Sequence, residues 1–265
     1  MTYAGLASAR LSVAQLEHVI DHVDDDQWEL PSACNGWRVI DVVAHLGALA
    51  HEAVDPPEPD PTWPKNRERY HDMRVDQRRG WSRADVIDEW LNYAPRQLDL
   101  LASGQEPPRA DEPVEVSGLG TYPRHLLANT MAFNVLCHLR YDMLVPDGPL
   151  RFDLPAATGD LIAPAVEFML AGLPQMQGSE LVDAVGVPIV LVLTGPGATV
   201  ATVLPADGPR GRLTVVPGVE GSTWITSAAT DFIAWATTRK TWRDYCHVTG
   251  DASAAASFLD RLNIV

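Results

Sequence analysis

The stretch that decides the fold is LLANTMAFNVLCHLRYDML, residues 126–144. Apolar side chains occupy nearly every face of a helix formed by it, so we expect this helix to lie at the centre of a bundle. Polar residues interrupt the apolar surface at every fourth position, on one narrow stripe. They are Thr130, Asn134, His138 and Asp142. A polar stripe on a buried helix must be hydrogen-bonded, hydrated or bound to a ligand.

The segments before this helix also have helical periodicity. Apolar residues recur at helical spacing over residues 7–28 and again over residues 39–50. Ser82, followed three residues later by Asp85, is typical of a capping box that opens a further helix. Together with residues 126–144, these segments predict four helices.

Two stretches without apolar periodicity separate the predicted helices. One is proline-rich and acidic, over residues 55–64, and the other covers residues 104–119. Both are predicted to be loops. Long helices joined mainly by loops predict a four-helix bundle over residues 1–150, with no strand before Pro146.

The hydrophobic period changes in the last third of the chain. Beyond Val185 it becomes that of strands, and Gly195-Pro196-Gly197 separates two of them as the turn of a hairpin. The predicted strands cover residues 187–194, 199–204, 212–216 and 223–227.

Three further helices are predicted in this part of the chain. The first covers residues 157–173, the second is capped by Thr230 or Asp231, and the last is capped by Asp251. With the strands, they predict a smaller α+β domain over residues 151–265. The fold class is therefore α+β, a helical bundle followed by this second domain.

Net charge limits the classes of binding partner, and cysteine content indicates the cellular compartment. The formal net charge is −15, which disfavours binding to nucleic acid and to anionic membranes. We find no segment apolar enough to span a membrane and no signal-peptide pattern. The three cysteines (Cys34, Cys137 and Cys246) form no CxxC motif. A reducing, cytoplasmic compartment fits these features.

A second histidine adds to the polar stripe. His45 flanks the apolar face of residues 39–50, so it can face the crevice between helices. Metal sites in bundles are built from inward side chains on facing helices, and imidazole is their commonest ligand. We therefore predict that the rings of His45 and His138 lie within about 8 Å of each other and share a metal or a water. The alternative is a structural network in which Asn134, His138 and Asp142 satisfy one another.

One stretch carries a resemblance to a known family. It runs from Gln27-Trp28 to Pro31-Ser-Ala-Cys-Asn-Gly-Trp-Arg-Val-Ile-Asp-Val-Val-Ala-His-Leu46. This run resembles the mycothiol-dependent maleylpyruvate isomerase family, with its pattern Pro-x-x-Cys-x-Gly-Trp-x-Val-x-Asp-Val-x-x-His-Leu. Residues 231–251 resemble that family's second domain more loosely. The resemblance implies a DinB-like four-helix bundle followed by a sterol-carrier-like α+β domain.

The resemblance also implies a metal site. In that family a divalent metal, usually zinc, is held by a histidine that corresponds to His45 and by a Glu-x-x-x-His pair. The pair corresponds to Asn134 and His138, so an amide replaces the carboxylate. A neutral amide oxygen is a weaker zinc ligand than a carboxylate, which predicts weak or absent metal binding. Asp142, four residues beyond His138, is a candidate replacement, although the helix ends nearby and the chain is expected to turn outward there.

The family's chemistry assigns further roles. A low-molecular-weight thiol such as mycothiol would bind the metal as thiolate and add to an electrophilic carbon of the substrate. Beside this, we take His138 and Asp142 as candidate catalytic residues. Arg239 occupies the position of a family arginine and can meet a substrate carboxylate, although Thr238 stands beside it where glycine is usual. Cys137 is expected to point away from the stripe, and Cys34 is expected to serve in packing.

Three functional hypotheses follow. The first is a thiol-dependent isomerase or S-transferase that acts on a small electrophile in the bundle crevice. The second is a metal-less relative that binds a small molecule or serves as an accessory protein. The third is a thiol-independent enzyme in which His138 and Asp142 form an acid–base pair. Substrate and oligomeric state stay open.

Overall fold

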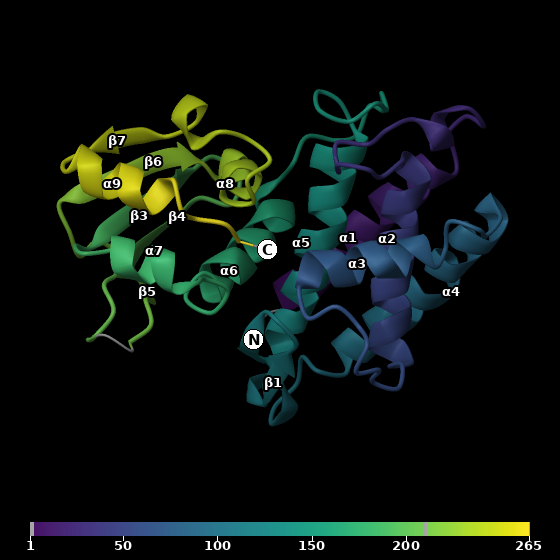
Figure 1. The fold of residues 1–265 in the computed structure, drawn as a ribbon, viewed down its shortest axis with the longest axis horizontal. Coiled ribbons are helices and arrows are strands. Elements are labelled where there is room, and N and C mark those ends of the chain that lie inside the picture. The colour runs from purple at the N-terminus through teal and green to yellow at the C-terminus, as the bar shows by residue number, and fades with distance from the viewer. Residues whose placement is uncertain (1–2, 209–210, 265) are drawn as a thin grey trace.

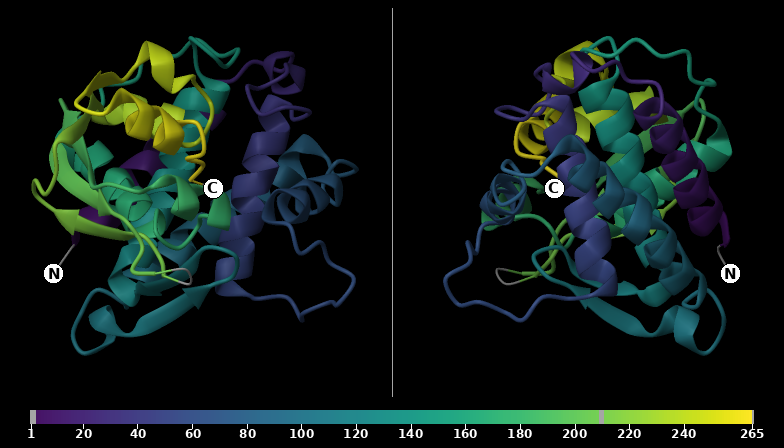
Figure 2. Two further views of the ribbon diagram at one scale, coloured as in Figure 1. Left: turned by 60° about the vertical axis from the view of Figure 1, so that its left-hand side comes forward. Right: turned by 90° about the vertical axis from the view of Figure 1, so that its right-hand side faces the viewer.

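The fold is described by a computed structural model that covers residues 3–208 and 211–264. Helices gather on one side of the molecule, and a sheet with further helices beside it lies on the other (Figure 1). Four of the long helices are α1 (Tyr3–Ile20), α2 (Val39–Val54), α4 (Arg83–Ala102) and α5 (Leu127–Cys137). A fifth, α6 (Gly159–Gly172), packs against both α1 and α5 (Figure 2).

Side-chain caps mark the starts of two of these helices, and the sequence predicted the one at Ser82. At the start of α4, the Ser82 hydroxyl accepts from the backbone N–H of Asp85, and the Asp85 carboxylate accepts from the backbone N–H of Ser82, both at 3.2 Å. The predicted capping box is confirmed. At the start of α2, the Asp41 carboxylate accepts from the backbone N–H of Arg38 at 2.9 Å.

The predicted helix over residues 126–144 has two parts. After α5 the chain continues as a π-helix, His138–Met143, in which the Leu144 N–H donates to the Leu139 carbonyl, five residues back. The wider turn changes the direction of the side chains that follow it. Single π-turns inside helices are rare and often occur at functional sites.

Two elements in the first half were not predicted. A hairpin of β1 (Pro113–Val116) and β2 (Gly120–Pro123) shows that the prediction of no strand before Pro146 is wrong. Its strands have only four residues each, too few for a clear alternation. Helix α3 (Arg67–Asp76) also escaped prediction, because Val75 is its one buried residue and no apolar face marks it.

The second half contains a mixed five-stranded sheet in the order β5-β4-β3-β6-β7. The pair β3 and β6 is parallel and the other pairs are antiparallel. The strands are β3 (Ile189–Thr194), β4 (Thr199–Leu204), β5 (Thr214–Pro217), β6 (Thr223–Ala228) and β7 (His247–Thr249). The α+β fold class and the four predicted strands are therefore confirmed, with strand ends that move by at most two residues.

The helices beside the sheet are α7 (Ser179–Ala184), α8 (Ala229–Ala236) and α9 (Ala252–Leu259). The Asp251 carboxylate caps α9 by accepting from the N–H groups of Ser253 and Ala254, as predicted. The predicted cap of α8 is wrong: the helix begins at Ala229, ahead of Thr230 and Asp231, and has no side-chain cap. Short α7 and β7 lack a periodic signal of their own.

Helix α5 is central because it contributes to two apolar cores. Phe133 and Leu136 pack with α6 and the sheet, whereas Met131 and Val135 pack with α1, α2 and α4. Burial on both sides is the feature that its nearly continuous apolar sequence predicts. The boundary between domains near residue 150 stays a prediction, since α6 contacts both α5 and α8.

Among the described residues, no helix is both long enough and apolar enough to cross a membrane.

Candidate functional site

A cavity of about 580 Å³ lies beside the polar stripe of the central helix. Asn134, His138 and Asp142 line it, together with His45 from α2. Thr130, the first member of the stripe, instead donates to the Leu126 carbonyl of its own helix at 3.4 Å. The stripe and the second histidine therefore meet in one cavity, as the sequence predicts.

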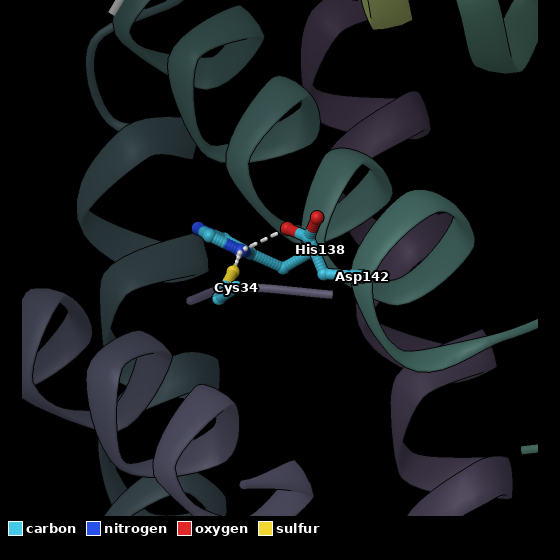
Figure 3. Close-up of side chains that lie close together, drawn as sticks. All are labelled: Cys34, His138 and Asp142. Atoms are coloured by element: carbon cyan, nitrogen blue, oxygen red, sulfur yellow. Dashed lines mark hydrogen bonds and ion pairs between the residues drawn. The ribbon is translucent and has the colours of Figure 1, made fainter. Parts of the chain in front are cut away.

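Asp142 links His138 to Arg239. Its carboxylate accepts two hydrogen bonds from Arg239, from Nε and from Nη2, each at 2.8 Å. It also accepts one from Nδ1 of His138 at 2.8 Å, which Figure 3 shows from the side of Cys34. The Asp142 side chain is only 1% exposed, so its carboxylate is removed from water.

The carboxylate determines which nitrogen of His138 carries a proton. Burial alone would raise the pKa of Asp142, but the hydrogen bonds from Arg239 and His138 hold that pKa well below its usual range. An ionised carboxylate only accepts hydrogen bonds, so Nδ1 of His138 must be the protonated nitrogen. The other nitrogen, Nε2, points away from Asp142 and Cys34 and is free to act as a base or a ligand (Figure 3).

One expectation about this group is wrong. Asp142 does not turn outward: its side chain lies inside the protein, where Arg239 neutralises it. Arg239 lines the cavity with its Nε–Nη2 edge bound to Asp142, and its contact with a substrate carboxylate stays a prediction. The preceding residue, Thr238, has φ +59°, a left-handed conformation that suits the glycine usual there.

Three imidazole rings lie beside one another in the cavity. The ring centroids of His45 and His138 are 4.9 Å apart, which confirms the predicted approach of these two residues. The ring of His71, from α3, lies 4.7 Å from that of His45. His45 is almost fully buried, and its Nδ1 has no hydrogen-bond partner among the described residues.

Burial keeps two of these rings neutral. It lowers the pKa of His45 well below the usual value, and the nearby His138 and His71 lower it further. The pKa of His71 falls to about 3, mainly through burial and then through the charges of Arg67 and His138. Neutral imidazoles can act as ligands or as hydrogen-bond partners at neutral pH.

This neutrality predicts a dependence of stability on pH. Below about pH 6.5 an unfolded His71 binds a proton that the folded chain accepts only near pH 3, so the free energy of unfolding should fall as the pH falls between these values. Urea unfolding of metal-free protein at pH 7, 6 and 5 measures the slope. His71→Gln should flatten it, whereas His18→Gln, at an exposed position, should not. Equal slopes for wild type and His71→Gln would contradict this account.

Cys34 lies in the cavity, where packing alone was expected. Its Sγ is 3.8 Å from Nδ1 of His138, although the side chain also packs against the bundle core. Burial, followed by the charge of Asp142, raises the pKa of this thiol, so it is protonated and a weak nucleophile. Cys137 is buried in the cavity wall, and burial raises the pKa of its thiol to about 12.

Cys34, His138 and Asp142 form a group that can hold a metal ion, because one donor atom of each lies within 4.8 Å of the others. In this group, however, the histidine atom is the Nδ1 that is already bound to Asp142. Asp142 in turn is neutralised by Arg239, and Cys34 keeps its proton. A cation bound here would have to replace the proton on Nδ1 of His138, the contact of Arg239 with Asp142 and the proton of Cys34.

The donors expected from the family fit a metal only in part. His45 and His138 are close enough to share one, and a carboxylate that holds Nδ1 of a ligating histidine is a common support of metal sites. The third position is the neutral amide of Asn134, which also lines the cavity. Asp142 is bound to His138 and Arg239 in this structure, and its role as a replacement ligand stays a prediction. The residues present therefore do not complete the family's ligand set.

The cavity contains residues that sequence reasoning missed. His71 and Arg67 come from α3, which has no periodic signal. Trp37, whose ring centroid lies 5.0 Å from that of His45, and Cys34 both belong to the run that carried the family resemblance. For Trp37 and Cys34, membership of that run was the one feature of the sequence that could have marked them as cavity residues.

Comparisons with known proteins agree with this architecture. The family model described as "Mycothiol maleylpyruvate isomerase N-terminal domain" matches residues 9–140. The crystal structure of the mycothiol-dependent maleylpyruvate isomerase has the same fold, with a TM-score of 0.56 and 18% identity, covering 92% of this chain and 91% of that one. A histidine-to-alanine mutant of that enzyme gives the same TM-score and coverage at 17% identity. No curated protein matches this chain.

Proposed function

Because residues 9–140 belong to the family of mycothiol maleylpyruvate isomerase N-terminal domains, we propose that this chain is a thiol-dependent isomerase or S-transferase. It acts on a small electrophile in the cavity beside α5, with mycothiol or a similar thiol as cosubstrate. The cavity volume of about 580 Å³ is of the size that small-molecule sites have.

The observation that carries this proposal is the chain of contacts from Arg239 through Asp142 to His138. Asp142 holds the ring of His138 with Nδ1 protonated, which leaves Nε2 as the base. An aspartate in this role orients the imidazole and stabilises its protonated form. Nε2 of His138 lies at the wall of the cavity, and an imidazole nitrogen in that place is suited to take a proton from a thiol.

The chemistry then needs one proton transfer and one addition. The thiol gives its proton to Nε2 of His138, and the thiolate forms a C–S bond to an electrophilic carbon of a conjugated substrate. In isomerisation, rotation about the former double bond follows, the C–S bond breaks, and the departing thiolate recovers the proton. In S-transfer, the adduct takes the proton and keeps the C–S bond.

No step of this proposal passes through a metal. A zinc ion would supply the same lowering of the thiol pKa, but Asn134 stands where the family has an anionic ligand. His138 held by Asp142 is the base that the chain itself provides.

An assay with mycothiol as thiol and maleylpyruvate as electrophile tests the proposal. We expect turnover that requires the thiol and persists after treatment with EDTA. His138→Gln should lower the rate by about 10²-fold or more, the usual contribution of a general base. His18→Gln, the same change at an exposed position, should leave it unaltered.

Two results would contradict the proposal. Turnover that is unchanged without thiol would favour the acid–base enzyme that uses His138 and Asp142 alone. Absence of both turnover and mycothiol binding, the latter followed through the fluorescence of Trp37 in the cavity wall, would favour a binding or accessory protein.

A further inference from the structure

Two arginines line the cavity among the described residues, and they differ in what they bind. Arg239 donates from Nε and Nη2 to Asp142, so one edge of its guanidinium is occupied and its charge is paired with that carboxylate. Arg67 donates from Nη1 to the backbone carbonyl of Ser117 at 2.6 Å. Its Nε is buried and has no acceptor in the part of the chain that the structure describes.

Arg67 stands close to the cavity histidines. It is the first residue of α3, one turn before His71. Its charge contributes to the low pKa of His71 and, less strongly, to that of His45, after burial in both cases. The guanidinium and the imidazole rings therefore line the same cavity, and the charge of the guanidinium is felt by the rings.

The positive charge of Arg67 is poorly compensated by the protein. Burial lowers its pKa, and the charge of Glu52 only partly opposes this effect. Glu52 is itself paired with Arg74 and accepts from the Tyr70 hydroxyl, and Arg67 forms no ion pair in the described structure. A half-buried cation with an unused donor is costly unless a ligand supplies the anion.

We propose that Arg67 is the carboxylate-binding residue of the cavity and that it receives an acid group of the substrate. The inference rests on the proposed function in one respect, that the ligand is the electrophilic substrate. The planar edge of a guanidinium carries two parallel N–H donors that match the two oxygens of a carboxylate. A ligand held in this way lies beside His71 and His45, whose rings lead to His138 in steps of 4.7 and 4.9 Å.

The family resemblance implied Arg239 as the residue that binds the substrate carboxylate, whereas this proposal gives that role to Arg67 on α3. Arg239 then acts as a positioning residue that holds Asp142, and through it His138. A ligand bound by its carboxylate at Arg67 lies in the cavity that His138 also lines.

Direct binding of maleate, a small dicarboxylate, to the full chain tests the proposal without thiol or turnover. Isothermal titration calorimetry at neutral pH should give an affinity that falls about tenfold or more in Arg67→Gln. Arg69→Gln removes the same charge from an exposed position on α3 and should change the affinity less than twofold. Arg67→Lys, which keeps the charge without the planar edge, should recover only part of the loss.

Several outcomes would overturn the inference. They are wild type that does not bind maleate at millimolar concentration, equal losses in Arg67→Gln and Arg69→Gln, and binding of inorganic phosphate that depends on Arg67 while maleate binding does not. Thermal unfolding of each variant checks that the fold is kept, and Arg67→Lys carries the test if Arg67→Gln unfolds. Arg67-dependent maleate binding without any thiol-dependent turnover would refute the proposed function and leave this inference standing.

Discussion

Asp142→Ala should lower the free energy of unfolding by about 3–5 kcal/mol. The change leaves Arg239, whose side chain is only 25% exposed, without its carboxylate. It also leaves Nδ1 of His138 without its acceptor. Urea unfolding followed by circular dichroism measures the loss.

A matched control lies a few residues away. Asp147 pairs with Lys240, the neighbour of Arg239, but this pair is more exposed. Asp147→Ala should therefore cost no more than about 1 kcal/mol. Similar losses for Asp142→Ala and Asp147→Ala would show that burial does not strengthen the Asp142 contacts.

The contribution of the Asp142–Arg239 pair to stability can also be measured by a double-mutant cycle and by its dependence on pH. Asp142→Ala with Arg239→Ala should cost less than the sum of the single changes, because the double variant leaves no buried charge unpaired. The folded pKa of Asp142 is depressed, so its contribution is complete above the ordinary carboxyl pKa and is lost as the pH falls below it. Additive losses would contradict the pairing.

Asp142→Asn separates catalysis from stability. The amide keeps the shape of the side chain but no longer requires a proton on Nδ1 of His138. We expect the thiol-dependent rate to fall by about 10²–10⁴-fold, with a smaller loss of stability than in Asp142→Ala.

Asn134→Glu should have the second large effect, a clear increase in zinc content. Glutamate restores an anionic ligand one helical turn before His138, on the cavity wall that His45 also lines. Wild type purified without a histidine tag should contain much less than one zinc per chain. Metal analysis after dialysis against zinc and removal of excess measures the difference, with a gain of about tenfold in affinity as the expected scale for an added charged ligand.

Asn134→Gln is the matched control, since glutamine has the length of glutamate without its charge. It should not raise zinc content. Stoichiometric zinc in wild type would contradict the weak-site interpretation.

Short-range patterns account for the parts of the site that the sequence predicted. The four-residue spacing of Asn134, His138 and Asp142 places them on one side of the central helix, and the apolar residues around them require that this helix be buried. His45 follows from the same argument on α2. The hairpin turn at Gly195–Gly197 and the Asp251 cap are also local, and both are found as predicted.

The site residues that the sequence did not identify lie in segments without hydrophobic periodicity. Helix α3 has a single buried residue, so nothing in its sequence marks Arg67 or His71 as cavity residues. Cys34 belongs to a turn whose cysteine can pack or react, and only its 3.8 Å approach to His138 distinguishes the two roles.

The sequence by itself determined which helix is central, which of its faces is polar and where the strands of the second half lie, because each depends on residues a few positions apart. Only the tertiary structure decided that Asp142 binds both Arg239, 97 residues away, and His138. An arginine in a sequence can face solvent, a ligand or a carboxylate equally well. The choice is made when burial removes water from the carboxylate and leaves the guanidinium as its partner.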